Sequence, residues 1–158
     1  MARTILNPFD PEQYRCIGCS PSNPIGLHLQ FYEEGDEVFA HWNPDENMQG
    51  YINVLHGGIQ TTLMDEIASW TVYIKLQTAG VTESLSVDFH KPVYINKGPL
   101  TVRAKVSSVE GKHALIETGI YNSKEELCAS GKMVYFIYPQ EVARRRLHYP
   151  GIEAFYEK

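Results

Sequence analysis

Residues 57–76 carry apolar side chains at helical spacing, and this stretch constrains the fold most. The apolar residues recur at intervals of four, four and three, and three more broaden the stripe: Ile59, Leu63, Ile67 and Trp70, then Met64, Ala68 and Ile74. Such spacing places them along one broad face of an α-helix. Because that face covers much of the circumference, we expect a buried helix that ends near Thr78-Ala79-Gly80.

The segments on both sides of this helix alternate apolar and polar residues, which predicts strands. Two such segments precede the helix as a hairpin and four follow it: 27–32, 38–42, 84–90, 101–106, 114–120 and 127–138. Two strands, one long buried helix and four strands predict an α+β fold in which an antiparallel sheet wraps around the helix.

The length of 158 residues fits a single domain. A chain of this size can bury a core without metals or disulfides. We divide it into a lead-in over 1–24, a core over 25–138 and a tail over 139–158. Prolines at positions 8, 11, 21 and 24 favour a loop in the lead-in, since proline disrupts helices and central strands.

Composition excludes several classes of partner. The net charge of −5 argues against nucleic-acid binding, which needs a basic footprint. No run reaches the roughly 20 apolar residues of a membrane helix, and the first residues lack the apolar stretch of a signal peptide. Three cysteines without a dense framework are typical of reduced thiols. We therefore expect a cytoplasmic protein with no membrane partner.

The segment His56-Gly57-Gly58 leads directly into the predicted helix. A helix N-terminus offers unpaired N–H groups and the positive end of the helix dipole, and glycines there let a ligand approach the backbone closely. Such a position can hold an anion or the oxyanion of acyl transfer. The alternative interpretation is a tight entry into the helix, with His56 as its cap.

Asp65 and Glu66 lie inside this mostly apolar helix. Burying a carboxylate is costly unless it is paired or functional. The two side chains point roughly 100° apart on a helix, so at most one of them needs to face a site. The alternative is that both lie on a narrow solvated strip.

These residues together resemble the hotdog-fold acyl-CoA thioesterases of the phenylacetate (PaaI-like) type. The resemblance covers about residues 14–138 and rests on His56-Gly57-Gly58, Leu63-Met64-Asp65-Glu66, Gln49-Gly50, the strand from Ser86 to Val93, Cys16-Ile17-Gly18-Cys19, and Asn23-Pro24-Ile25-Gly26-Leu27. Some members carry an asparagine six residues before the histidine; here that position is Gly50, and the nearest asparagine is Asn53.

The resemblance implies a role for each matching residue. Gly57 would polarise the thioester carbonyl through its N–H, and Asp65 would be the general base or the nucleophile. His56 would orient the site or the carbonyl, and Thr82 would hold the attacking water. The expected substrate-binding residues are Asn53, Gly58, Glu66 and Gln49.

The spacing of Gly57 and Asp65 adds a geometric constraint. Eight residues along a helix span about 12 Å, whereas reacting groups must converge within about 3–3.5 Å. One subunit therefore cannot present both groups to one carbonyl. We expect a homodimer with its active sites at the interface, with a tetramer as the larger alternative.

The expected reaction is hydrolysis of an acyl-CoA thioester, with coenzyme A as part of the substrate and no further cofactor. A hotdog enoyl-CoA hydratase or dehydratase and a non-catalytic acyl-CoA-binding module are the alternatives. We expect no metal, because Cys16 and Cys19 form a lone C-x-x-C without a second ligand pair. Arg144-Arg145-Arg146 either meets coenzyme A phosphates or forms a solvated helix face.

Overall fold

The central helix occupies the predicted position. The computed structural model describes residues 1–158, and in it α1 (Gly57–Lys75) ends three residues before the predicted stop signal at Thr78-Ala79-Gly80. Its inner face includes residues with no exposed surface, among them Leu63, Met64, Ile67 and Ala68. Trp70 stacks on Phe31 with ring centroids 4.2 Å apart. The helix is therefore held by apolar contact with the sheet, as its periodicity predicts.

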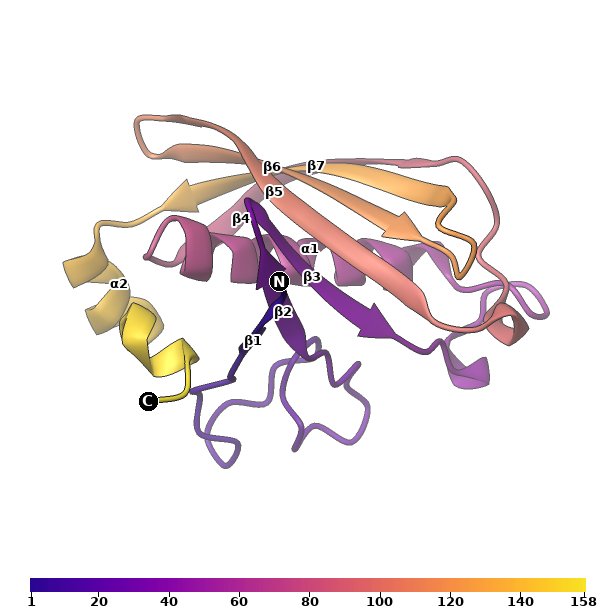
Figure 1. The fold of residues 1–158 in the computed structure, drawn as a ribbon, viewed down its shortest axis with the longest axis horizontal. Coiled ribbons are helices and arrows are strands. Elements are labelled where there is room, and N and C mark those ends of the chain that lie inside the picture. Colours follow the sequence, from indigo (N-terminus) through magenta and orange to yellow (C-terminus); the bar gives the residue numbers. More distant parts are fainter.

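Seven strands form one antiparallel sheet in the order β1-β2-β3-β5-β6-β7-β4. Their bounds are β1 (Arg3–Ile5), β2 (Phe31–Glu34), β3 (Glu37–Trp42), β4 (Gly80–Phe89), β5 (Leu100–Glu110), β6 (His113–Tyr121) and β7 (Leu127–Ile137). The sheet lies over α1 along its length (Figure 1). This arrangement confirms the α+β fold with an antiparallel sheet wrapped around a long central helix.

The first predicted strand begins later than expected. His28 has a φ of 56°, in the left-handed region that interrupts a strand, so β2 starts at Phe31 rather than at Leu27. Leu27 and Leu29 are nevertheless buried. The alternation therefore identified the buried side chains correctly but not the hydrogen-bonded strand.

The lead-in and the tail pack against the same core. Most of the lead-in is loop, but β1 pairs with β2 and adds an unpredicted strand to the sheet. The tail contains α2 (Gln140–Leu147) and buries Ala143, Tyr149 and Phe155. The two termini meet where the Leu6 N–H donates to the Phe155 carbonyl at 2.7 Å. Short 3-10 turns complete the chain: η1 (Glu46–Met48), η2 (Ile95–Lys97) and η3 (Ile152–Phe155).

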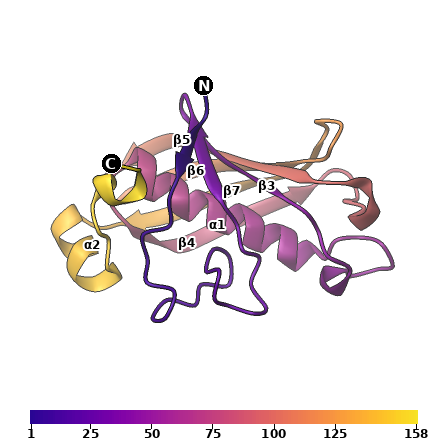
Figure 2. The ribbon, with the colours of Figure 1, turned by 60° about the horizontal axis from the view of Figure 1, so that its bottom comes forward.

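Strand β4 is the exposed edge of the sheet. It pairs only with β7, and its apolar residues Val81, Leu85 and Phe89 are 42%, 44% and 55% exposed. In the rotated view β4 runs along the open side of the sheet, next to α1 (Figure 2). None of the helices combines the length and the apolarity that crossing a membrane requires.

Candidate functional site

The N-terminus of α1 presents a free backbone donor. The His56 Nδ1 accepts a hydrogen bond from the Gly58 N–H at 2.8 Å, which caps the helix. The Gly57 N–H has no hydrogen-bond acceptor in the structure. Gly57 lines a cavity of about 680 Å³. His56 thus caps the helix through Nδ1, and the Gly57 N–H remains free for a ligand.

The cavity wall includes residues that the sequence analysis did not select. Phe89 reaches across from β4, so that a Cβ on Gly57 would lie 3.3 Å from its ring. Gln60 lines the cavity and is buried, and its Oε1 has no hydrogen-bond partner. Gln60 was detectable from the sequence as a polar residue one turn into an apolar helix. Phe89 required the register of β4.

Two of the predicted binding residues build the loop instead of lining this cavity. Asn53 has a φ of 61°, and its N–H donates to the Gln49 Oε1 at 2.8 Å. Its side-chain amide donates to the Asn96 Oδ1 at 2.9 Å, and the Asn96 N–H donates back at 3.1 Å. Asn53 and Gln49 therefore fix the segment that precedes the helix.

Asp65 lies in a separate hydrogen-bonded group on α1. The Thr82 hydroxyl donates to the Asp65 Oδ1 at 2.8 Å, and the Tyr135 hydroxyl donates to the same oxygen at 2.6 Å. Both donors use Oδ1, and Oδ2 has no partner in the structure. The carboxylate is therefore held in position while one oxygen stays free to act on a proton or a carbonyl carbon.

The sheet register explains this grouping. Thr82 on β4 lies directly opposite Tyr135 on β7, so both side chains leave the same face of the sheet, toward α1. Burial first, and then the negative charge of Asp65, raises the pKa of Tyr135, which keeps its hydroxyl a donor. The structure thus brings together the predicted Asp65 and Thr82, and it adds Tyr135.

Within one chain, Asp65 and Gly57 do not share a site. Asp65 is absent from the lining of the Gly57 cavity, in agreement with the roughly 12 Å that eight helical residues span. Glu66 is not brought to either group. Its carboxylate accepts from the Trp70 Nε1 at 3.1 Å and lies beside the Cys16 thiol at 3.3 Å, facing the lead-in. Burial raises the pKa of Glu66 to about 8.

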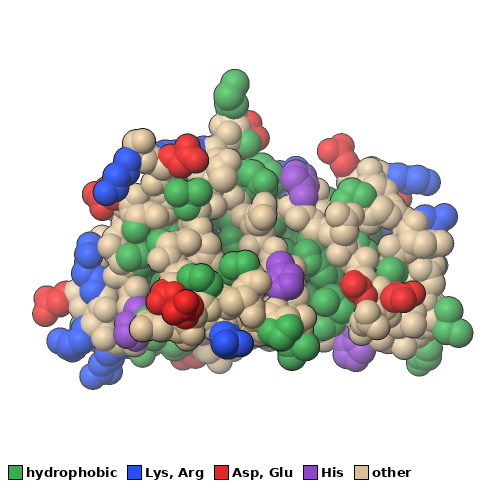
Figure 3. Space-filling view, turned by 90° about the horizontal axis from the view of Figure 1, so that it is seen from below, with side chains coloured by type: hydrophobic (Ala, Val, Ile, Leu, Met, Phe, Trp, Pro, Cys, Tyr) green, Lys and Arg blue, Asp and Glu red, His purple; other side chains and the backbone are tan.

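Basic side chains lie at two places relative to the Gly57 cavity. A neighbouring cavity of about 460 Å³ shares Lys91 and Pro92 with it and is also lined by Lys97 and Lys124. The three exposed arginines of α2 are Arg144, Arg145 and Arg146, at the opposite end of α1 from Gly57. Lys and Arg side chains gather at that end of the surface (Figure 3, left). Within one chain, only the lysines are near the helix N-terminus.

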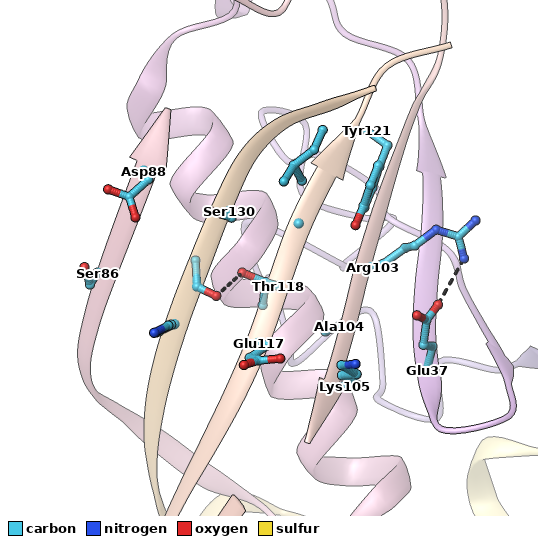
Figure 4. A pocket seen from close by; sticks show the side chains of 14 residues that line it. Glu37, Ser86, Asp88, Arg103, Ala104, Lys105, Glu117, Thr118, Tyr121 and Ser130 are labelled. Atoms are coloured by element: carbon cyan, nitrogen blue, oxygen red, sulfur yellow. Dashed lines mark hydrogen bonds and ion pairs between the residues drawn. The ribbon is translucent and has the colours of Figure 1, made fainter. Parts of the chain in front are cut away.

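A further cavity, of about 470 Å³, lies on the face of the sheet away from α1 (Figure 4). Charged side chains of both signs line it, and Arg103 pairs with Glu37 at 3.1 Å. Lys105 and Lys132 flank Glu117 on the neighbouring strands. Because its charges largely neutralise one another and neither Gly57 nor Asp65 reaches it, this cavity is not part of the candidate site.

Comparison with known families identifies one match. The family model described as "Thioesterase superfamily" matches residues 52–129, a range that contains Gly57, Asp65 and Thr82. Tyr135 and the two cysteines of the lead-in lie outside that range. The comparison with curated proteins finds no match.

Solved structures share the fold. A thioesterase superfamily protein aligns with a TM-score of 0.69 and 23% identity, over 80% of this chain and 59% of that one. A hypothetical thioesterase with coenzyme A, from Streptococcus pneumoniae TIGR4, aligns at 0.63 and 21%, over 67% and 84%. The E. coli PaaI protein from the phenylacetic acid degradation operon aligns at 0.64 and 18%, over 72% and 82%. The architecture is the hotdog fold.

Proposed function

We propose, from the homology of residues 52–129 with the thioesterase superfamily, that this chain hydrolyses an acyl-CoA thioester to a carboxylate and free coenzyme A. One observation carries the proposal: the Asp65 carboxylate is held through Oδ1 by Thr82 and Tyr135. It lies on the same helix as the unpaired Gly57 N–H. The motif around His56 and Asp65 supports the PaaI-like type within that superfamily.

In this proposal the Gly57 N–H and the positive end of α1 polarise the thioester carbonyl. Asp65 takes a proton from water through its free Oδ2, and the hydroxide adds to the carbonyl carbon. The resulting oxyanion is stabilised at Gly57. Its collapse breaks the C–S bond, and the coenzyme A thiolate leaves and takes up the proton. As the alternative, Asp65 itself attacks, and water then hydrolyses the mixed anhydride.

The catalytic unit in this proposal is a homodimer. Gly57 and Asp65 of one chain cannot reach the same carbonyl, so a second copy must supply one of them. The edge strand β4 offers unpaired backbone groups and the exposed side chains of Leu85 and Phe89. Exposed edges of this kind favour pairing with another strand. A two-fold axis would make that pairing self-complementary and would create two equivalent sites.

Binding of coenzyme A is assigned to the helix end that carries Gly57. Lys91, Lys97 and Lys124 surround the adjoining cavity, and Lys91 is partly neutralised by Glu126. Phosphate groups are attracted to lysines and to helix N-termini. The chain's overall negative charge therefore does not prevent it from binding a polyanion locally. The neighbour from Streptococcus pneumoniae, whose structure contains coenzyme A, supports coenzyme A as the ligand.

A thiol-release assay over a panel of acyl-CoA substrates tests the proposal, with Asp65→Ala as the variant. We expect release of free thiol by the native chain and a fall in kcat of about 10²–10⁴-fold in Asp65→Ala, with a smaller change in KM. The same protein is assayed for hydration of enoyl-CoA. Hydration without thiol release, or an unchanged kcat in Asp65→Ala, would contradict the proposal.

A further inference from the structure

Outside the candidate active site, two cysteines of the lead-in meet a carboxylate of the central helix. The ligand atoms of Cys16, Cys19 and Glu66 all lie within 4.8 Å of one another. The Cys16 Sγ and the Glu66 Oε1 are 3.3 Å apart, although 50 residues separate them in the chain. The sequence offered only a lone C-x-x-C, and the fold supplies a third group from α1.

These separations are close to those of a tetrahedral zinc site. Zinc binds sulfur at about 2.3 Å and carboxylate oxygen at about 2.0–2.2 Å. In a tetrahedron these bond lengths place the ligand atoms about 3.5–3.8 Å apart. The cluster therefore needs to adjust by no more than about 1 Å to enclose an ion, a shift within the reach of side-chain rotation.

The surroundings already hold the three groups in place. The Gly18 N–H donates to the Cys16 Sγ at 3.3 Å, so the loop points a backbone donor at the sulfur. The Trp70 Nε1–H orients the carboxylate from the side of α1. A Cβ on Gly18 would lie 2.5 Å from the Glu66 Cδ, so only glycine fits between the loop and the carboxylate. Outer hydrogen bonds of this kind are typical of metal ligands.

We propose that Cys16, Cys19 and Glu66 bind one zinc ion, with a water molecule as the fourth ligand. A cavity of about 160 Å³ lined by all three side chains provides room for that water. Binding releases the protons of the two thiols and of the carboxyl group, because each binds as an anion. Two thiolates select a borderline-soft ion over Mg²⁺ or Ca²⁺, and the carboxylate disfavours Cu(I).

The site would tie the lead-in to the central helix. The lead-in loop lies beside α1 (Figure 2), and β1 is the only regular element of the lead-in. A metal bound by two groups on the loop and one on the helix links these elements across the surface of the core. This role is separate from the proposed hydrolysis: the Asp65 side chain bonds Thr82 and Tyr135, whereas the neighbouring Glu66 side chain bonds Cys16 and Trp70.

The test uses the full chain, treated with a chelator and a non-thiol reductant, and titrated with Zn²⁺ and with Co²⁺. We expect one ion per chain, thiolate-to-cobalt charge transfer in the near ultraviolet, and intense visible bands of tetrahedral Co²⁺. Zn²⁺ should raise the Tm. Cys128→Ser is the matched control, since Cys128 is a buried thiol on β7 outside the cluster.

Substitution of each of the three ligands, compared with the control Cys128→Ser, separates loss of zinc binding from loss of folding. Cys16→Ser and Cys19→Ser should weaken Zn²⁺ binding by more than the roughly 10–100-fold that loss of an outer partner costs, and Cys128→Ser should not. Glu66→Gln should keep the charge-transfer band but bind less tightly, and circular dichroism of the metal-free proteins shows whether each variant folds. Unchanged Zn²⁺ affinity in both cysteine variants would overturn the proposal. So would a reduced native chain that binds no zinc and forms only a Cys16–Cys19 disulfide on oxidation.

Discussion

Two neighbouring residues at the N-terminus of α1 have different roles, one in capping the helix and one in binding a ligand. His56 accepts the hydrogen bond from Gly58, which stabilises the helix end. Gly57 keeps its N–H unpaired. The resemblance to known thioesterases assigns both residues to the chemistry. The structure adds that their tasks differ: Gly57 offers a backbone N–H, whereas the capping bond to the His56 Nδ1 places the proton of the neutral imidazole on Nε2.

The role of the Gly57 N–H can be isolated by two substitutions that add the same Cβ. Proline is well tolerated at the first helical position but has no N–H, whereas alanine retains it. We expect Gly57→Pro to lower kcat/KM by about 10²–10³-fold relative to Gly57→Ala, with a Tm close to that of Gly57→Ala. Steady-state thiol-release kinetics and thermal unfolding measure both. Equal kcat/KM values for the two variants would exclude an oxyanion role.

A cluster of charged and polar side chains around Glu33 joins four parts of the fold: β1, β2, α1 and the tail. Its carboxylate pairs with Lys75 at the end of α1 at 2.8 Å, and it accepts from the Tyr156 hydroxyl. Arg3 on β1 lies 4.0 Å away. This cluster ties both ends of the chain to the last turn of the central helix.

The same cluster makes stability depend on pH. Burial opposes ionisation of Glu33, but its hydrogen bonds with Lys75 and Tyr156 and the nearby positive charges hold its pKa below the usual value. A carboxyl group with a lowered pKa stabilises the folded state above its unfolded pKa of about 4.3, and this contribution is lost as the pH falls. We expect Glu33→Gln to cost about 1–3 kcal/mol at pH 7, and less below pH 4.

Denaturant unfolding of the native chain and of Glu33→Gln between pH 3 and pH 7 measures this effect. The control is Glu34→Gln, because Glu34 is exposed and pairs only with the N-terminus. The Glu34→Gln substitution should lower the free energy of unfolding by less than about 1 kcal/mol at every pH. A difference between Glu33→Gln and the native chain that does not change with pH would show that the loss is one of packing rather than of charge.

Most helices and strands could be predicted from the sequence, and the predictions that were wrong have local causes. The helix over 57–76 and the four strands after it follow from periodicity, since each element buries one face against the same core. The strand expected from Leu27 fails because His28 adopts a left-handed conformation. Strand β1 was missed because three residues are too few to show an alternation.

At the scale of the whole molecule, β4 leaves the sheet open on one side. Its position at the edge follows from the order in which β7 returns beside it. The exposed Leu85 lies opposite the buried Met133, so both side chains are on the face of the sheet that packs against α1. Leu85 continues this row of apolar side chains past the part of the sheet that α1 covers. In the proposed function a second copy of the chain covers this row, because Gly57 and Asp65 of one chain are too far apart to act on the same carbonyl.

A charge placed in this row should disrupt the assembly. We expect Leu85→Arg to be monomeric and to lose most of its thiol-release activity, because burying an arginine without a partner is strongly unfavourable. Val109→Arg, at a position on β5 that is 45% exposed, is the control and should keep both properties. Analytical ultracentrifugation and activity at matched concentration report the result. A fully active monomer would refute the interfacial site.

Mixing two inactive variants tests the shared site directly. If each site combines Gly57 of one copy with Asp65 of the other, a heterodimer of Gly57→Pro and Asp65→Ala contains one intact site. Random exchange of equal amounts should then restore about a quarter of the native activity. The mixture is prepared by reversible dissociation, and each variant treated alone is the control. Activity no higher than the mean of the two variants would mean that each chain completes its own site.

Local sequence patterns predict a buried helix, alternating strands, a donor at Gly57, and a carboxylate eight residues further along. The distant groups that meet these residues follow from the three-dimensional fold. Tyr135 reaches Asp65 from 70 residues away, because the register of β4 and β7 places it beside Thr82. Glu66, predicted beside the substrate, instead meets Cys16 from 50 residues away. Such contacts depend on strand register and chain path, which no local pattern encodes.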